Sequence, residues 1–194
     1  EKQNKLTLRK ARLEITPAIN YRQLEAVFDK WMIMPDRGIL RLLISFVIAN
    51  KLPGKALWMI IIGPSGGGKT EFLNSLLLLS DVVPISILTP NTFLSGMPGP
   101  KDSSLLPKLT GKITVIKDLS TILSMQKEAR AELFSQFREI WDGFMKKVFG
   151  NGRIATWSGK VSFLAASTQA VDLNQQQLAH LGERFLNYRP IMPD

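Results

Sequence analysis

The residues most able to do chemistry lie at positions 63–70, in the segment GPSGGGKT. This segment fits the pattern G-x-x-x-x-G-K-[ST] in full. Its glycines allow the backbone to curl so that successive N–H groups point at phosphate oxygens, and the following helix adds its positive end. Lys69 brings a positive charge to the β and γ phosphates, and the Thr70 hydroxyl binds Mg²⁺. The segment predicts a site for ATP and Mg²⁺. A glycine-rich turn with an unrelated lysine is the alternative.

The expected ATP contacts extend one residue past this glycine loop, because an acidic residue follows the threonine directly. They are Gly63, Pro64, Ser65, Gly66, Gly67, Gly68, Lys69, Thr70 and Glu71.

Such a loop needs a carboxylate nearby to hold Mg²⁺. After the loop, residues 113–116 form the strand-like run that ends in a carboxylate, and we expect Asp118 to bind the metal. An aspartate that caps a helix is the alternative. Many ATPases of this class have a glutamate directly after that aspartate, which polarises the attacking water, but here the position is Leu119. The base must come from elsewhere or be weak. Its candidates are Glu71, Glu128, Glu132 and Glu139.

Two further polar positions complete the predicted catalytic set. Ser167 and Thr168 close an apolar run, and Thr168 is expected to orient the water or contact the γ phosphate, with a simple strand-end cap as the alternative. Arg184 lies between a predicted helix and the last predicted strand. There it would face the nucleotide of a neighbouring subunit as an arginine finger, unless it is an ordinary surface arginine.

Alternating strands and helices must position these residues. The apolar run 57–62 leads straight into the loop, as a buried parallel strand does. The sequence also predicts strands at 82–88, 112–116, 160–166 and 185–188, and helices at 21–31, 37–50, 70–79, 127–149 and 173–181. Asp36 is the expected N-cap of the second helix. This order predicts an α/β fold, a three-layer sandwich whose mainly parallel sheet is covered on both faces.

Residues 127–149 are the clearest periodic segment, with an aromatic stripe that we interpret as core and not as a cofactor site. Residues 150–152 end that helix. The segments 153–157 and 160–166, joined by Ser158 and Gly159, predict a β-hairpin whose second arm continues as a core strand.

Composition sets the remaining bounds. A chain of 194 residues with 45% hydrophobic and 21% charged residues fits one globular domain. The absence of cysteine excludes disulfide and thiol chemistry. The first residues show no signal-peptide pattern, and no apolar run reaches the ~20 residues of a membrane span. We therefore expect a cytoplasmic protein. The first residue is not Met, which suggests a fragment of a longer protein.

The net charge of +9 is uneven, since residues 1–55 hold 11 Lys and Arg against 5 Asp and Glu. A basic segment of this kind is expected to bind nucleic acid, or else is a solvated terminus. The interpretation is a basic amino-terminal segment at 1–34 and an ATPase domain at 35–194.

These parts in this order resemble the AAA+ ATPases over about residues 36–190, and more closely the branch that includes minichromosome-maintenance helicases. The glycine loop, the hairpin 150–160 and the segment 183–185 carry the resemblance. In that branch the hairpin projects into the channel of a ring and touches DNA. The resemblance implies DNA contacts at Arg153 and Lys160, with Trp157 available to stack on a base. The chain also resembles bacterial ATP-binding proteins found with phages and mobile elements.

Three functions remain open. The first is an ATP-driven helicase or translocase that works on DNA as a homo-oligomeric ring, with replication of a mobile element as one setting. The second is an ATP-dependent assembly switch with slow hydrolysis, in regulation or phage defence, which Leu119 favours. A small-molecule kinase is the third. It is disfavoured because such kinases usually lack both the hairpin and the trans arginine.

Overall fold

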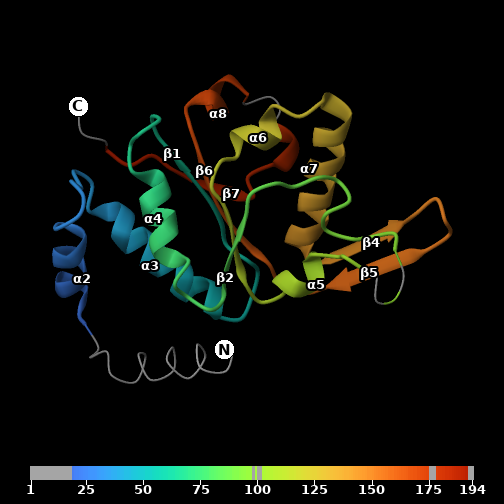
Figure 1. The fold of residues 1–194 in the computed structure, drawn as a ribbon, viewed down its shortest axis with the longest axis horizontal. Coiled ribbons are helices and arrows are strands. Elements are labelled where there is room, and N and C mark those ends of the chain that lie inside the picture. Colours follow the sequence, from blue (N-terminus) through green and yellow to red (C-terminus); the bar gives the residue numbers. More distant parts are fainter. Residues whose placement is uncertain (1–18, 98, 100–101, 175–177, 192–194) are drawn as a thin grey trace, which may run out of the picture.

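The computed structural model describes residues 19–97, 99, 102–174 and 178–191. Of the basic amino-terminal segment 1–34, residues 1–18 lie outside the described residues. Within the described part, five strands form one sheet in which every neighbouring pair is parallel (Figure 1). Across the sheet the order is β2 (Val82–Ile85), β3 (Ile113–Ile116), β6 (Ser162–Ser167), β1 (Trp58–Ile62) and β7 (Phe185–Tyr188). The predicted α/β class and parallel sheet are confirmed.

The strand order brings distant segments to the same end of the sheet. β6 lies between β1 and β3, as expected for the strand that ends at Ser167. Because all five strands run in the same direction, the segments after β1, β3 and β6 emerge together at what we call the carboxyl end of the sheet. The amino end, where the strands begin, lies opposite.

Helices cover both faces of the sheet, because residues along β1 alternate between two buried clusters. Met59 and Ile61 belong to one cluster, and Trp58, Ile60 and Ile62 to the other. The first face carries α2 (Tyr21–Phe28), α3 (Gly38–Lys51) and α4 (Lys69–Leu76). The second carries α5 (Leu106–Leu109), α6 (Ser120–Leu123), α7 (Lys127–Asp142), α8 (Ala170–Leu173) and the 3₁₀ turn Ala179–Leu181. The helices thus form two outer layers around the sheet (Figure 1).

An aromatic cluster fills the second face. Trp58 is fully buried, and its ring meets those of Phe137, Trp141 and Phe163 at centroid distances of 5.7, 5.2 and 4.7 Å. Its indole N–H donates to the Val161 carbonyl oxygen at 2.8 Å, which satisfies its polar atom. The aromatic stripe of α7 is therefore core, as predicted.

The predicted helix 127–149 is wrong in its last part, because α7 ends at Asp142. Gly143 follows with a φ of +82°, a left-handed conformation that ends helices. Phe144–Val148 then forms β4, whose side chains alternate between exposed and buried. β4 pairs antiparallel with β5 (Ile154–Ser158), so the hairpin turns at residues 149–153. The predicted turn at Ser158 and Gly159 instead leads into the parallel strand β6.

Other differences concern element ends. The predicted strand 82–88 stops at Ile85, and the predicted helix 173–181 is replaced by α8 and the 3₁₀ turn on either side of residues 175–177. α3 begins at Gly38 with Arg37 as its N-cap residue, so the predicted N-cap Asp36 lies one position too early, although its Oδ1 accepts the Gly38 N–H at 2.8 Å. Among the residues described, every helix is too short or too polar to cross a membrane.

Candidate functional site

The glycine loop lies where the sequence predicts it, between β1 and α4 at the carboxyl end of the sheet (Figure 1). Gly66 and Gly68 have φ angles of +79° and +73°, which residues with a Cβ rarely adopt. The Gly63 N–H donates to the Ser167 carbonyl oxygen at 3.2 Å, which fastens the start of the loop to β6. The loop is therefore a glycine-dependent curl anchored to the sheet, as a phosphate-binding segment requires.

Lys69 is the first residue of α4 and is only 8% exposed. Its Nζ donates to the carbonyl oxygens of Gly63 and Pro64 at 2.8 and 2.5 Å. Burial lowers the pKa of Lys69, and the negative charge of Asp118 acts in the opposite direction. The lysine and the aspartate thus share one electrostatic environment although 48 sequence positions separate them.

Asp118 follows β3 and stands next to Ser167 in the strand register, since each lies two positions beyond the pair Ile116 and Ala165. Its side chain is exposed, and Oδ1 accepts the Ser120 N–H at 2.9 Å at the start of α6. The capping role weighed as the alternative is therefore present. It uses one carboxylate oxygen and leaves Oδ2 for a second role.

Leu119 is 1% exposed and belongs to the core beneath α6 and α7. Its N–H donates to the Ala166 carbonyl oxygen at 2.8 Å, which holds the residue against β6. A carboxylate at this position would be buried among apolar side chains, so the usual glutamate after the aspartate does not fit here.

The alternative bases occupy different surroundings. Glu71 is exposed in the first turn of α4 and lines a hollow with Gly66 and Lys69. Glu132 Oε1 accepts the Lys147 ammonium at 3.0 Å and the Gln136 amide at 3.2 Å, so it is tied to the hairpin. The remaining two, Glu128 and Glu139, are exposed on α7. Of the four, Glu71 is the one beside the loop.

The end of β6 presents two hydroxyls with different surroundings. Ser167 is 2% exposed, and its Oγ has no hydrogen-bond partner among the described residues. Thr168 is half-buried, and its carbonyl oxygen accepts the Val171 N–H at 3.2 Å at the start of α8. The sequence favoured Thr168 as the residue that contacts the phosphate or water. The buried, unpartnered hydroxyl adjacent to Asp118 and β1 is that of Ser167.

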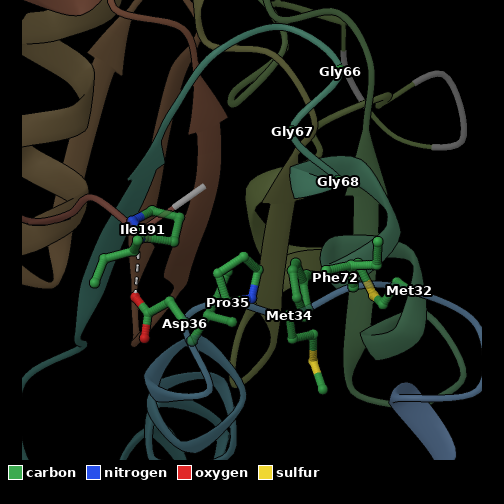
Figure 2. Close-up of a pocket in the computed structure, with 12 residues that line it drawn as sticks. Met32, Met34, Pro35, Asp36, Gly66, Gly67, Gly68, Phe72 and Ile191 are labelled. Carbon is green, nitrogen blue, oxygen red and sulfur yellow. Dashed lines mark hydrogen bonds between the residues drawn. The ribbon is translucent and has the colours of Figure 1, made fainter. Parts of the chain in front are cut away.

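An apolar hollow of about 240 Å³ opens beside the glycine loop (Figure 2). A Cβ on Gly68 would lie 3.1 Å from the Met32 methyl group, which shows how closely the hollow approaches the loop backbone. The sequence did not predict this hollow, because three separate segments build it. Its lining residues are Met32, Ile33, Met34, Pro35, Asp36, Ile39, Gly66, Gly67, Gly68, Phe72, Pro190 and Ile191.

Asp36 is the charged residue of this hollow and closes one side of it. Oδ2 accepts the Tyr188 hydroxyl at 2.6 Å and the Ile191 N–H at 3.2 Å. Burial alone would raise the pKa of Asp36, but these hydrogen bonds and the one from Gly38 lower it. Burial and the carboxylate raise the pKa of Tyr188 to about 12. The segment after β7 is thereby fastened to the start of α3.

Arg184 stands at the amino end of the sheet, directly before β7. Its Nη1 donates to the Leu181 carbonyl oxygen at 2.7 Å, and its buried Nε has no partner among the described residues. β1 alone separates the two ends by five residues, about 17 Å at 3.3 Å per residue. Arg184 is therefore remote from the glycine loop of its own chain.

The three predicted DNA contacts are engaged inside the chain. Trp157 is 5% exposed, and its indole N–H donates to Thr110 Oγ1 at 2.9 Å, so the expectation that it stacks on a base is corrected. Arg153 forms an ion pair with Asp102 at 2.5 Å. Lys160 Nζ donates to the Leu52 carbonyl oxygen at 2.8 Å. Intramolecular contacts of these kinds are not visible in the sequence.

Neither family models nor curated proteins match this chain. The described residues contain no group of three or more His, Asp or Glu side chains placed to hold a metal ion. The described residues form an α/β protein with a glycine loop, a buried lysine and an aspartate at the carboxyl end of a parallel sheet.

Proposed function

We propose that the chain binds Mg·ATP at the carboxyl end of the sheet and hydrolyses it as one subunit of an oligomer that acts on DNA. The observation that carries the proposal is the buried Lys69, which stands at the end of a glycine curl and within the electrostatic reach of Asp118. Such a lysine, together with inward backbone N–H groups, is suited to a polyphosphate.

The donor set suits magnesium bound together with phosphates. Mg²⁺ is usually held by one or two carboxylates plus phosphate oxygens and water, so a larger acidic cluster is not required. Thr70 and Asp118 would supply the protein oxygens, and Ser167 offers a hydroxyl without a partner in the described residues. When bound, the metal would neutralise charge that develops on the phosphates.

The apolar hollow beside the loop suits the base of the nucleotide. Methionine and phenylalanine side chains provide a surface for a flat ring, and the hollow touches the same glycines that would hold the phosphates. This arrangement supports a nucleotide over a simple polyphosphate as the ligand.

The oligomer follows from the position of Arg184. Because it lies at the opposite end of the sheet from Lys69, it would reach the phosphates only in a neighbouring copy. The resemblance to ring-forming AAA+ ATPases supports the same arrangement, and the net charge of +9 supports a polyanionic partner such as DNA.

An assembly switch with slow hydrolysis is the second candidate, and the burial of Leu119 favours it. Glu71 is the carboxylate nearest the loop among the candidates, but it lies in the exposed first turn of α4. A site without a well-placed base would retain ATP for longer, which suits a protein that assembles on ATP and is released by hydrolysis.

ATP turnover with and without single- and double-stranded DNA separates these functions. A DNA motor should show strong stimulation that is lost in Lys69→Ala and Arg184→Ala. The exposed Lys117 provides a charge-matched control for Lys69→Ala, since Lys117→Ala removes the same charge from a position outside the glycine loop. Tight ATP binding with turnover unmoved by either DNA would exclude the motor and favour the switch.

Mixing Lys69→Ala with Arg184→Ala subunits tests the shared site. If the site is shared, some interfaces in the mixture pair an intact loop with an intact arginine, and activity returns. A mixture that stays inactive while the subunits still co-assemble would contradict a role for Arg184 in trans.

A further inference from the structure

A second hollow, of about 460 Å³, lies at the amino end of the sheet, opposite the glycine loop. Three lysines from separate segments line it. Lys51 ends α3, Lys112 precedes β3, and Lys160 lies between the hairpin and β6. We call this feature the lysine hollow. Neither the hairpin nor the nucleotide site accounts for it.

The lining of the lysine hollow carries an excess of positive charge. Its acidic residue is Asp81, whose carboxylate lies 3.5 Å from Lys51 Nζ. The Lys51 side chain is nevertheless 59% exposed, so solvent and solutes reach it. With three lysines and one aspartate, the hollow attracts anions.

Buried hydrogen bonds hold the base of the hollow rigid. The Asn50 amide oxygen accepts the Ser162 hydroxyl at 2.6 Å and the Leu57 N–H at 2.8 Å. Its amide nitrogen donates to the Leu57 carbonyl oxygen at 3.3 Å. These hydrogen bonds join α3, the start of β1 and β6 beneath the hollow.

The backbone around the hollow offers few free donors. Gly111 N–H donates to the Lys160 carbonyl oxygen at 2.7 Å, and Ser162 N–H to that of Lys112 at 3.1 Å. The Ile113 N–H donates to the Asp81 carbonyl oxygen at 2.9 Å. These N–H groups are therefore not available to surround a single phosphate in the hollow. Its ammonium groups act as separate point charges, which suits a chain of phosphates.

We propose that the lysine hollow binds the phosphodiester backbone of a nucleic acid strand. The proposal rests on the action on nucleic acid proposed above, but it moves the contact from Arg153 and Trp157 to Lys51, Lys112 and Lys160. Lysines at a backbone carry no base information, so binding is independent of sequence. Lys55 and Lys108 are also exposed, on the segments that lead into β1 and to Lys112.

Fluorescence anisotropy with labelled single-stranded DNA, without nucleotide and over a range of salt, tests the proposal. The variant is Lys51→Gln/Lys112→Gln, which leaves the Lys160 hydrogen bond intact. The matched control, Lys127→Gln/Lys146→Gln, removes the same charge from exposed positions on α7 and β4, outside the basic amino-terminal segment. ATP binding to each protein, followed with a fluorescent ATP analogue, reports on the nucleotide site separately.

If each lysine contacts one phosphate, the hollow variant should lower the salt slope by about 1.4, at ~0.7 per contact on a single strand. This change in slope corresponds to about 25-fold weaker binding of single-stranded DNA near 0.1 M salt. The control variant and Lys69→Ala should bind DNA as the wild type does.

Three results would overturn the proposal. Equal losses in the hollow and control variants would mean that only overall charge matters. Binding of pyrophosphate by the wild type that is lost in the hollow variant, with no measurable binding of a long strand, would indicate a small-anion site. Wild-type protein that binds ATP but no nucleic acid would refute this contact and the DNA part of the proposed function together, while leaving ATP binding intact.

Discussion

The two ends of the central sheet differ in what their polar side chains are doing. At the carboxyl end, Asp118 keeps an oxygen free of hydrogen bonds within the described residues, and the Ser167 hydroxyl has no partner there. At the amino end, Lys160 donates to the Leu52 carbonyl oxygen and Arg184 to that of Leu181. Uncommitted groups gathered around a glycine curl are typical of a ligand site, whereas committed groups hold the structure together.

The two ends of the sheet also suit different kinds of anion. The carboxyl end is built for one compact anion that backbone N–H groups can surround. The amino end is lined by spaced lysines on a fixed base, which suits an extended anion. Substitutions at each end should therefore change different measurements.

Lys69→Ala gives the largest expected effect. Loss of the buried ammonium should lower ATP turnover by about 10³-fold or more, equivalent to ~4 kcal/mol of transition-state stabilisation. Steady-state turnover and nucleotide binding measure the effect, with Lys117→Ala as the control. Turnover within about threefold of the wild type would show that the carboxyl end is not the catalytic site.

Leu119→Glu tests whether the missing base can be restored. The side chain would be buried in the core, so we expect a loss of at least ~3 kcal/mol in the free energy of unfolding and no gain in turnover. Urea unfolding measures the loss, and Leu119→Met should cost less than ~1.5 kcal/mol. A stable, faster enzyme would mean that residue 119 reaches the site.

Trp157→Phe separates a structural from a DNA-binding role at the hairpin. The variant loses the hydrogen bond to Thr110 and some packing, which should cost about 1–2 kcal/mol of folding stability. Its affinity for single-stranded DNA should not change. A stable protein with weakened DNA binding would restore the stacking role that the burial of Trp157 excludes.

Loss of the ion pair between Arg153 and Asp102 gives the smallest expected effect. The direction in which this pair makes stability depend on pH follows from the pKa of Asp102. Hydrogen bonds from Ser104, then the contact with Arg153, lower the Asp102 pKa from 3.8 to about 2. A lowered pKa means that its stabilisation is fully present above about pH 4 and is lost as the pH falls toward 2. NMR titration of the carboxyl group measures this shift. Ser104→Ala should raise the pKa more than Arg153→Gln, and the reverse order would give the arginine the larger part.

What the sequence could predict depended on how local the feature is. The glycine loop is contiguous, and its residues alone require a curl between a buried strand and a helix. The position of β6 between β1 and β3 also followed, because the polar end of that run suggested a place beside the acidic strand. Asp118 was predicted in the same way, because it follows the end of a strand. It lies eight residues before Gln126, the residue that precedes α7.

Features that combine distant segments were missed. The apolar hollow joins residues near 34, 68 and 191, and no local pattern marks it. The hairpin was misread because the apolar stripe of α7 appears to continue through Phe144 and Val148, while Gly143 ends the helix and the period changes from helix to strand. Both Phe144 and Val148 are in fact exposed, at 54% and 65%.

The two hydrogen bonds of Lys69 to carbonyls of its own loop have a consequence for affinity. A phosphate that approaches the ammonium competes with Gly63 and Pro64 for the same protons. Recognition at this position is therefore an exchange of acceptors, and only the difference between the old and new partners contributes to the binding constant. A ligand with a single weak acceptor gains little from that exchange, whereas the concentrated charge of a polyphosphate gains much. If the loop binds ATP as proposed, this exchange would favour a polyphosphate over ordinary polar solutes.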